Sequence, residues 1–358
     1  SLAALPALRD PAGARELYAA LVERLSLAGA KSIVLTTPLA EPQSERGVVY
    51  ARKVREAVAR MGDGSALAAE LSRITDEAEK TLDTDARLAA TLSRAGNVFL
   101  ASQYTLSAAG STPLPDYAHR SVLRDPGAIA LPAAVARYPT ASIGGAAAGV
   151  GHLAAMPDAD GRVRKIPLLL RHDGVGIPAL ALLIAGHSLH LGAQELRVQA
   201  PSGVWLGGVQ VPADQHGFLW PRFRANASEI SPAYPTHAFS AAIGAEAPQA
   251  AFKDKIVLVG ETSDTRVQRV MLPSARTAYP VEVLAETIGA IRQRLGVVQP
   301  SWAAAVSGVC AVLALLAVAW MLPRWSSSTR WVAVTALAVL TVGIEWGLLR
   351  YAGLWLPL

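Results

Sequence analysis

The stretch from Trp302 to Leu322 reads WAAAVSGVCAVLALLAVAWML and contains no charged side chain. An α-helix of this length rises about 30 Å, which matches the hydrocarbon core of a bilayer. Trp302 and Trp320 stand near its two ends, where aromatic side chains favour the membrane interface. The stretch therefore predicts a transmembrane helix over residues 301–323.

A second apolar run follows, and the two runs together predict a membrane hairpin. The run from Trp331 to Leu349 has Glu345 as its only charged side chain, which predicts a second transmembrane helix over 331–350. The link 324–330 carries two arginines, so the tendency of positive loops to stay inside predicts a cytoplasmic turn. Residues 351–358 are again apolar and predict the start of a third span. The alternative is a buried helical hairpin of a soluble protein, but two runs of this length are rare in soluble cores.

The residues before Trp302 have the composition of a water-soluble protein. Charged side chains make up 17% of the 358-residue chain and lie mostly in this part. If the turn 324–330 is cytoplasmic, residues 1–300 form one extracytoplasmic domain. Cys310 is the only cysteine, so no intramolecular disulfide is possible. The chain does not begin with methionine or with a signal peptide, and we expect the natural protein to begin earlier.

Strand and helix patterns alternate through residues 1–300 and predict an α/β fold. Because buried strands alternate with amphipathic helices, we expect a largely parallel central sheet flanked by helices. Residues 43–84 are predicted to be a helical insertion, and the segment Asp83-Thr84-Asp85 is predicted to cap the helix that follows it. The predicted helices are 14–28, 45–61, 66–82, 86–95, 177–189 and 281–294. The predicted strands are 32–36, 98–102, 146–153, 163–170, 196–199, 209–211, 217–220 and 255–260, and a hairpin turn is predicted at 157–161.

Several segments of this part resemble the CHASE domain of the second class, an extracellular sensor domain associated with cyclases, histidine kinases and Ser/Thr kinases. The resemblance covers about residues 10–300. The segments that carry it are LAGAKSIVL (27–35), LDTDARLA (82–89), MPDADGRVRKIPL (156–168), YPTHAFS (234–240), FKDKIVLVG (252–260) and VEVLAE (281–286).

The resemblance implies a transmembrane receptor with its sensor outside the cell and an output domain beyond this chain. The output domains of the family include nucleotide cyclases, Ser/Thr kinases and histidine kinases. The chain departs from the family at Thr36, where an acid is usual at the end of the first strand. It departs again at Gln268, where the family tends to show an aspartate. Any ligand recognition by those acids is therefore in doubt for this chain.

We expect a ligand-binding edge where the predicted strands 32–36 and 255–260 end. Ligands of α/β folds bind outside the carboxyl ends of parallel strands. The polar residues that follow these two strands are Thr36, Thr37, Glu261 and Ser263. The alternative is that both segments are plain connections between a strand and a helix.

We predict no metal site, no catalytic residues and no cofactor. His187 and His190 share a helix face, but no acid or cysteine cluster joins them. The acids of Asp158-Ala-Asp160-Gly161 suit a hairpin turn better than a calcium loop, because basic residues follow. No hydrolase motif is present.

The sequence thus predicts a sensor that couples an extracellular ligand or periplasmic protein to a cytoplasmic output domain. We place it in a bacterial inner membrane, with residues 1–300 in the periplasm. We expect a homo-oligomer in contact with the lipid bilayer and no binding of nucleic acid, because the net charge of +5 is scattered. Two alternatives remain: an assembly module that holds a membrane complex together, and a periplasmic enzyme.

Overall fold

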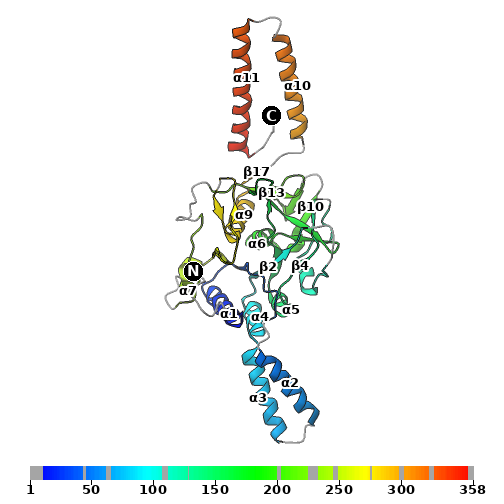
Figure 1. Cartoon of the computed structure of the whole chain (residues 1–358), viewed down its shortest axis with the longest axis vertical. Helices are drawn as coiled ribbons and strands as arrows, with labels where there is room; N and C mark the ends of the chain where they lie inside the picture. The colour runs from blue at the N-terminus through cyan, green and yellow to red at the C-terminus, as the bar shows by residue number, and fades with distance from the viewer. Residues whose placement is uncertain are drawn as a thin grey trace.

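A computed structural model describes residues 11–42, 46–61, 66–106, 112–127, 129–199, 203–224, 233–244, 249–274, 276–297, 302–321 and 326–353. A mixed α/β body lies in the middle of an elongated molecule (Figure 1). The helical hairpin α10 (Ala303–Met321) and α11 (Ser327–Gly347) extends from one end of the body. The hairpin α2 (Arg46–Met61) and α3 (Ala66–Leu82) extends from the opposite end.

Within the described residues, the central sheet has five strands, and four of them run parallel. Their order is β14 (Ile256–Val259), β1 (Ser32–Leu35), β2 (Val98–Tyr104) and β5 (Gly149–His152). The short strand β4 (Ala136–Arg137) pairs antiparallel with the end of β2. Parallel strands need crossover connections, and helices supply them here.

Side chains alternate between the two faces of this sheet, and each face is covered by helices. Ile33 and Leu35 face α1 (Pro11–Leu27) and α4 (Thr84–Ala95), whereas Val34 faces α6 (Leu180–Ser188) and α9 (Pro280–Gln293). All three side chains are fully buried. Burial of each such side chain contributes about 1.5–3 kcal/mol to folding. The strands of this sheet are therefore runs of consecutive apolar residues, because both faces of the sheet lie in the core.

In the part of the body that the structure describes, four smaller sheets with mostly antiparallel pairs accompany the central one. The β6–β7 hairpin turns through Gly161, whose φ of 77° suits glycine, and the Asp158 amide donates to the Arg162 carbonyl at 2.8 Å. The strands of these sheets are β3 (Leu131–Pro132), β6 (Met156–Pro157), β7 (Val163–Pro167), β8 (Leu169–His172), β9 (Val175–Pro178), β10 (Leu196–Gln199), β11 (Gly203–Leu206), β12 (Val209–Gln210), β13 (Phe218–Pro221), β15 (Val270–Met271), β16 (Thr277–Ala278) and β17 (Gly296–Val297).

Short helices connect these strands, and they complete the body. They are the 3₁₀ segments η3 (Asp116–Ser121) and η4 (Ala193–Glu195) and the α-helices α5 (Ala141–Ala146), α7 (Phe239–Ile243) and α8 (Gln249–Phe252). Parallel pairing occurs in the central sheet and between β3 and β8. The predicted α/β class is therefore confirmed as a mixed fold with several sheets.

Two predicted helix boundaries are wrong. Strand pairing explains the first. Residues 177–189 were expected to be helical throughout, but residues 175–178 form β9, which pairs with β8, and α6 begins at Leu180. The second boundary lies in the link 324–330. The helix α11 begins at Ser327 because the Ser326 hydroxyl accepts from the Thr329 amide, so Arg330 lies in the helix and not in a turn. Residues 322–325 lie outside the described residues.

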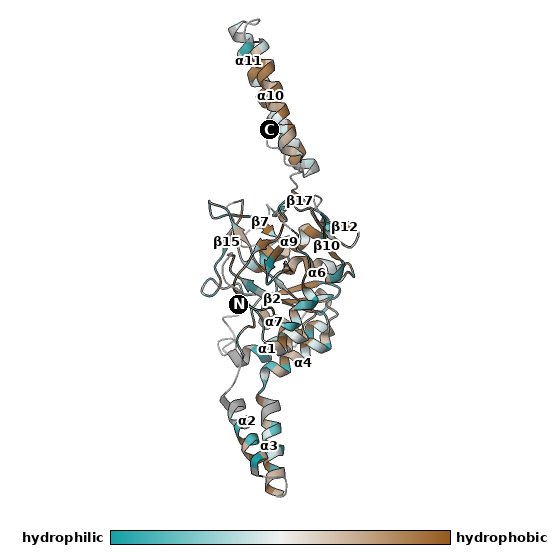
Figure 2. Ribbon diagram, turned by 90° about the vertical axis from the view of Figure 1, so that its right-hand side faces the viewer, coloured by the Kyte–Doolittle hydropathy of each residue, from teal (hydrophilic) through white to brown (hydrophobic). Residues whose placement is uncertain are grey.

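The two helices α10 and α11 are exposed and apolar (Figure 2). By length and hydropathy, one helix among the described residues is able to cross a membrane, over Thr329–Gly347, and the apolar stretch Ala305–Trp320 is shorter. A π-helical turn (Leu348–Ala352) follows α11 and ends at Gly353. The predicted third span falls mainly on residues 354–358, which lie outside the described residues.

Candidate functional site

The carboxyl ends of β1 and β14 lie side by side and hold Thr36 in a fixed position. Leu35 pairs with Val259 at the last register position of the two strands. The amide and hydroxyl of Thr36 both donate to the Val259 carbonyl, at 3.0 and 3.1 Å. Gly260 follows β14 and allows this close approach, because a Cβ there would lie 2.8 Å from the Thr36 hydroxyl and 2.7 Å from the Val281 Cβ.

Thr37 and Glu261 both lie close to Tyr18, which α1 contributes. The hydroxyl oxygens of Thr37 and Tyr18 are 2.9 Å apart. Burial is the main reason that the pKa of Tyr18 is raised, and the charge of Glu261 adds to it, while the hydrogen bond with Thr37 acts in the opposite direction. Glu261 also pairs with Arg266, with 3.4 Å between Oε1 and Nε. The edge thus brings together two hydroxyls, a carboxylate and a guanidinium.

Ser263 lies farther along the loop after β14 and bonds within that loop. Its hydroxyl is 2.8 Å from that of Thr265. Beyond it, Asp264 accepts from Arg269 at 2.6 Å and from the Tyr279 hydroxyl at 3.1 Å. The hydrogen bond from Arg269 is the main reason that the pKa of Asp264 is lowered, and the hydrogen bond from Tyr279 adds to the effect. The loop is therefore held in one shape by its own polar contacts.

A buried ion pair behind this edge was not foreseen from the sequence. The Arg15 Nε donates to the Asp85 carboxylate at 2.8 Å, and the guanidinium also donates to the Glu41 carbonyl at 2.8 Å. Both charged side chains are buried. The pair ties α1 to α4 and fixes the segment that follows Thr37. No local pattern indicates it, because its partners are 70 positions apart in the chain.

A second polar cluster lies beyond the ends of β2 and β5. The Tyr104 hydroxyl donates to that of Tyr138 at 3.2 Å, and the Tyr104 ring meets the edge of His172 at 5.4 Å. Both ring nitrogens of His172 face carbonyl oxygens, of Ala133 at 2.9 Å and Thr112 at 2.7 Å. Burial raises the pKa of Tyr138 to about 12. The sequence alone did not indicate this cluster, because its members come from separate weakly patterned segments.

The other polar motifs serve the fold. The His187 Nδ1 is 2.8 Å from the Ser32 hydroxyl, and its ring packs on Phe99, while His190 is exposed. No group of three or more metal-ligating side chains occurs within the described part of the chain. Asp160 pairs with Arg164 across the hairpin turn at 2.6 Å. The predicted hairpin at 157–161 is confirmed.

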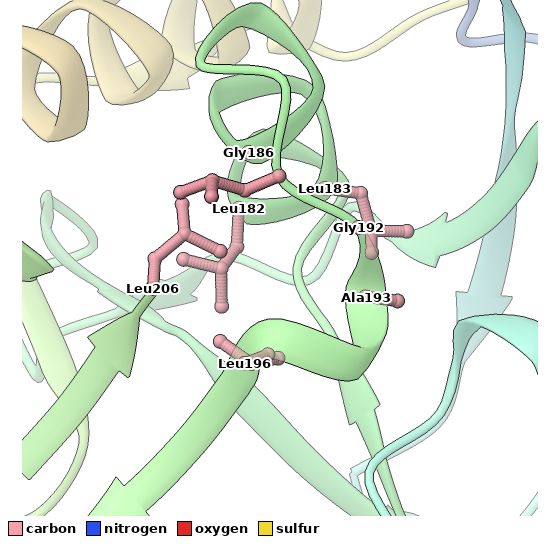
Figure 3. A pocket seen from close by; sticks show the side chains of 8 residues that line it. Leu182, Leu183, Gly186, Gly192, Ala193, Leu196 and Leu206 are labelled. Carbon is pink, nitrogen blue, oxygen red and sulfur yellow. The ribbon is translucent and has the colours of Figure 1, made fainter. Parts of the chain in front are cut away.

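A small apolar cavity lies between α6 and β11 (Figure 3). Its volume of about 10 Å³ is at the lower limit for holding one water molecule, so it is too small for an organic ligand. Its lining is Leu182, Leu183, Gly186, Leu191, Gly192, Ala193, Leu196 and Leu206. A hollow of this size and polarity is a packing defect and does not hold an organic ligand.

A comparison with known families gives a match. A family model described as the CHASE2 domain matches residues 8–323. The chain belongs to the CHASE2 domain family. CHASE2 domains are extracellular sensor domains of signalling receptors and are not catalytic. The match includes α10 and ends before α11. No curated protein and no solved structure is detectably similar to the chain.

Proposed function

We propose that this CHASE2 chain is the periplasmic sensing part of a transmembrane receptor in a bacterial inner membrane. In this proposal residues 1–300 face the periplasm, and α10 and α11 cross the bilayer as a hairpin. The chain passes the external signal on to a cytoplasmic cyclase or kinase domain. The single observation that supports it is the exposed apolar hairpin at one end of a polar body.

The exposure of α10 and α11 is the strongest physical argument for a lipid environment. Leu315 is 70% exposed and Val339 is 67% exposed, and Trp320 and Trp346 add large rings near the helix ends. Water-soluble monomers rarely expose a continuous apolar patch of more than a few hundred Å². In a bilayer, lipid tails cover such a surface, so its apolar side chains are not exposed to water. We therefore propose that α10 spans the membrane together with α11.

Single-cysteine labelling tests this topology. In a Cys310→Ser background, Gln194→Cys places a thiol on the exposed surface of the body, and Thr329→Cys places one at the start of α11. A membrane-impermeant maleimide should label position 194 in intact spheroplasts and position 329 only after lysis. Labelling of position 329 in intact spheroplasts, or of position 194 only after lysis, would contradict the proposed topology.

We further propose that the signal is recognised at the edge formed by Thr36, Thr37, Glu261 and Ser263. The support is the convergence of hydroxyls and charges at the carboxyl ends of two parallel strands. In the receptor with its output domain, Glu261→Gln should shift the half-maximal stimulus at least tenfold. The matched change Glu23→Gln on the exposed side of α1 should leave it unchanged. Equal responses of the two variants would place recognition elsewhere.

One observation favours the alternative function of an assembly module. The hairpin α2–α3 carries an apolar face that the body does not cover. An assembly role predicts that the receptor output is the same with and without stimulus. It also predicts that substitutions in the apolar face of α2–α3 change the size of the complex in detergent. A sensor predicts a stimulus-dependent output.

A further inference from the structure

The hairpin α2–α3 projects from the body as a two-helix arm and has two different faces. The helices pack on each other through small side chains, those of Ala51 and Val58 on α2 and of Ala68 and Thr75 on α3, all of which are buried. The contact between α2 and α3 is thus a narrow one. Beside this contact, Arg55 of α2 pairs with Asp76 of α3, with 3.7 Å between Nη1 and Oδ1.

Each helix carries an apolar stripe outside this contact. On α2 the stripe is Tyr50, Val54 and Ala57, which recur at the i, i+4, i+7 spacing of one helix face. Tyr50 is 64% exposed and Val54 is 43% exposed. On α3 the stripe is Leu67, Leu71, Ile74 and Ala78 at the same spacing, and Leu67 is 65% exposed.

The two stripes lie on the same side of the arm. At 100° per residue, each stripe is about a quarter turn from the buried contact of its helix, in the same rotational sense. Because the two helices run antiparallel, equal rotations bring both stripes to one side. The arm therefore presents one continuous apolar face made by both helices.

Charged side chains border this face with opposite signs on its two edges. Lys53 and Arg60 flank the stripe of α2, and Glu70 and Glu77 flank the stripe of α3. All four are exposed. The whole of α2 contains five basic residues and one acid, whereas α3 contains four acids and two basic residues. Arg73 pairs with both glutamates within α3, at 2.8 and 3.3 Å, and exposed pairs of this kind are weak.

A surface with one basic and one acidic edge is complementary to a copy of itself. The geometry points to a second copy of this chain on the apolar face, so that two arms form a four-helix bundle. In this bundle α2 of each copy lies over α3 of the other, and Lys53 and Arg60 face Glu70 and Glu77 of the second copy. The opposite arrangement, with α2 over α2, places basic edges against each other.

The charges thereby select the direction of the twofold axis. Only an axis parallel to the arm places α2 over α3 and keeps both copies pointing the same way. The arm and the α10–α11 hairpin both extend along the long axis of the molecule (Figure 1). Two receptors in one membrane need a twofold axis along the membrane normal, and the arm supplies it. This orientation argument rests on the proposed membrane function, whereas the self-complementary face does not.

Two alanines on α2 provide a matched test of the face. Ala57 lies in the stripe, and Ala59 lies on the opposite side of the same helix; both are exposed. The full chain in detergent should have the protein mass of two copies by light scattering. Ala57→Glu should weaken the dimer at least tenfold, and Ala59→Glu should leave it unchanged. A monomeric wild-type chain, or equal masses of the two variants, would overturn the proposal.

Cross-linking tests the arrangement of the two copies. Two differently tagged chains, both Cys310→Ser, carry Lys53→Cys in one and Glu77→Cys in the other. The pair should form a mixed disulfide, and two chains with Lys53→Cys should not cross-link. The reverse result would establish α2 over α2 and overturn the proposed axis. A different protein that copurifies and is lost in Ala57→Glu would also overturn the second copy as the partner. The labelling of positions 194 and 329 tests the membrane topology and does not depend on these results. A wrong topology and a wrong pairing of the arms can therefore be told apart.

Discussion

The buried histidine at the end of β5 should make the body sensitive to acid. His152 is 1% exposed, and its Nδ1 accepts from the Ala154 amide at 3.2 Å. Burial has the largest effect on its pKa, while a contact with the Leu168 backbone acts in the opposite direction. Burial lowers the pKa of His152 to about 3. In the folded chain, the His152 imidazole therefore stays neutral down to about pH 3. In the unfolded chain, it takes up a proton as the pH falls below about 6.5.

The sign and size of the effect follow from this difference in pKa. An unfolded histidine has a pKa of about 6.5, so between pH 6.5 and 3 the unfolded state binds one proton more than the folded state. The stability from His152 is complete above pH 6.5 and is lost as the pH falls. At pH 4.5 the loss amounts to about 3 kcal/mol. This is a large part of the 5–15 kcal/mol that stabilises a typical domain.

The variant His152→Asn isolates the contribution, because the amide oxygen takes the place of Nδ1 and the side chain does not titrate. We expect the free energy of unfolding to drop by about 3 kcal/mol more in the wild type than in His152→Asn between pH 7.5 and 4.5. Urea unfolding of the full chain in detergent, followed by tryptophan fluorescence, measures it. Titration of the carboxylates is common to both proteins and cancels. The exposed His119→Asn variant should behave as the wild type does. If the wild type and His152→Asn lose the same free energy, the buried imidazole is not the acid-sensitive group.

Three further substitutions test the candidate edge and its support. Asp85→Ala leaves the buried guanidinium of Arg15 without its partner and should cost about 3–5 kcal/mol in urea unfolding, whereas a cost below about 1 kcal/mol would show that Arg15 is rehydrated. Gly260→Ala brings a methyl group to 2.7 Å from the Val281 Cβ and should lower the free energy of unfolding by about 1–3 kcal/mol; no loss would mean that α9 moves freely. Tyr18→Phe removes one hydrogen bond to the segment after β1 and should cost about 1 kcal/mol, and a larger loss would indicate that the hydroxyl has more partners.

Local features of the fold could be predicted from the sequence. The segment 83–85 was expected to cap a helix, and within it the Asp83 carboxylate accepts from the Ala86 amide at 2.9 Å. The predicted helices 66–82 and 281–294 agree with α3 and α9 within one residue. Such features depend on neighbouring residues in the chain, because caps and apolar periodicity act within a few turns.

Features that depend on distant residues could not be predicted. Ile177 was assigned to a helix because the sequence after it is apolar, but pairing with β8 makes it part of a strand. For the candidate edge, the strand ends indicated Thr37 and Glu261, whereas Tyr18, which interacts with both, comes from a helix with no polar motif. Tertiary contacts decide such positions, and no short stretch of sequence contains both partners.

The paired strands β13 and β17 connect the body to both α10 and α11. Strand β17 leads within a few residues into α10, and Arg222, next to β13, donates to the Leu349 carbonyl just after α11 at 2.7 Å. A displacement of this two-stranded unit consequently reaches the first helix through the covalent chain and the second through one guanidinium. We therefore expect a displacement of β13 and β17 to act on the body-side ends of α10 and α11 together, and to tilt or shift the hairpin as a unit.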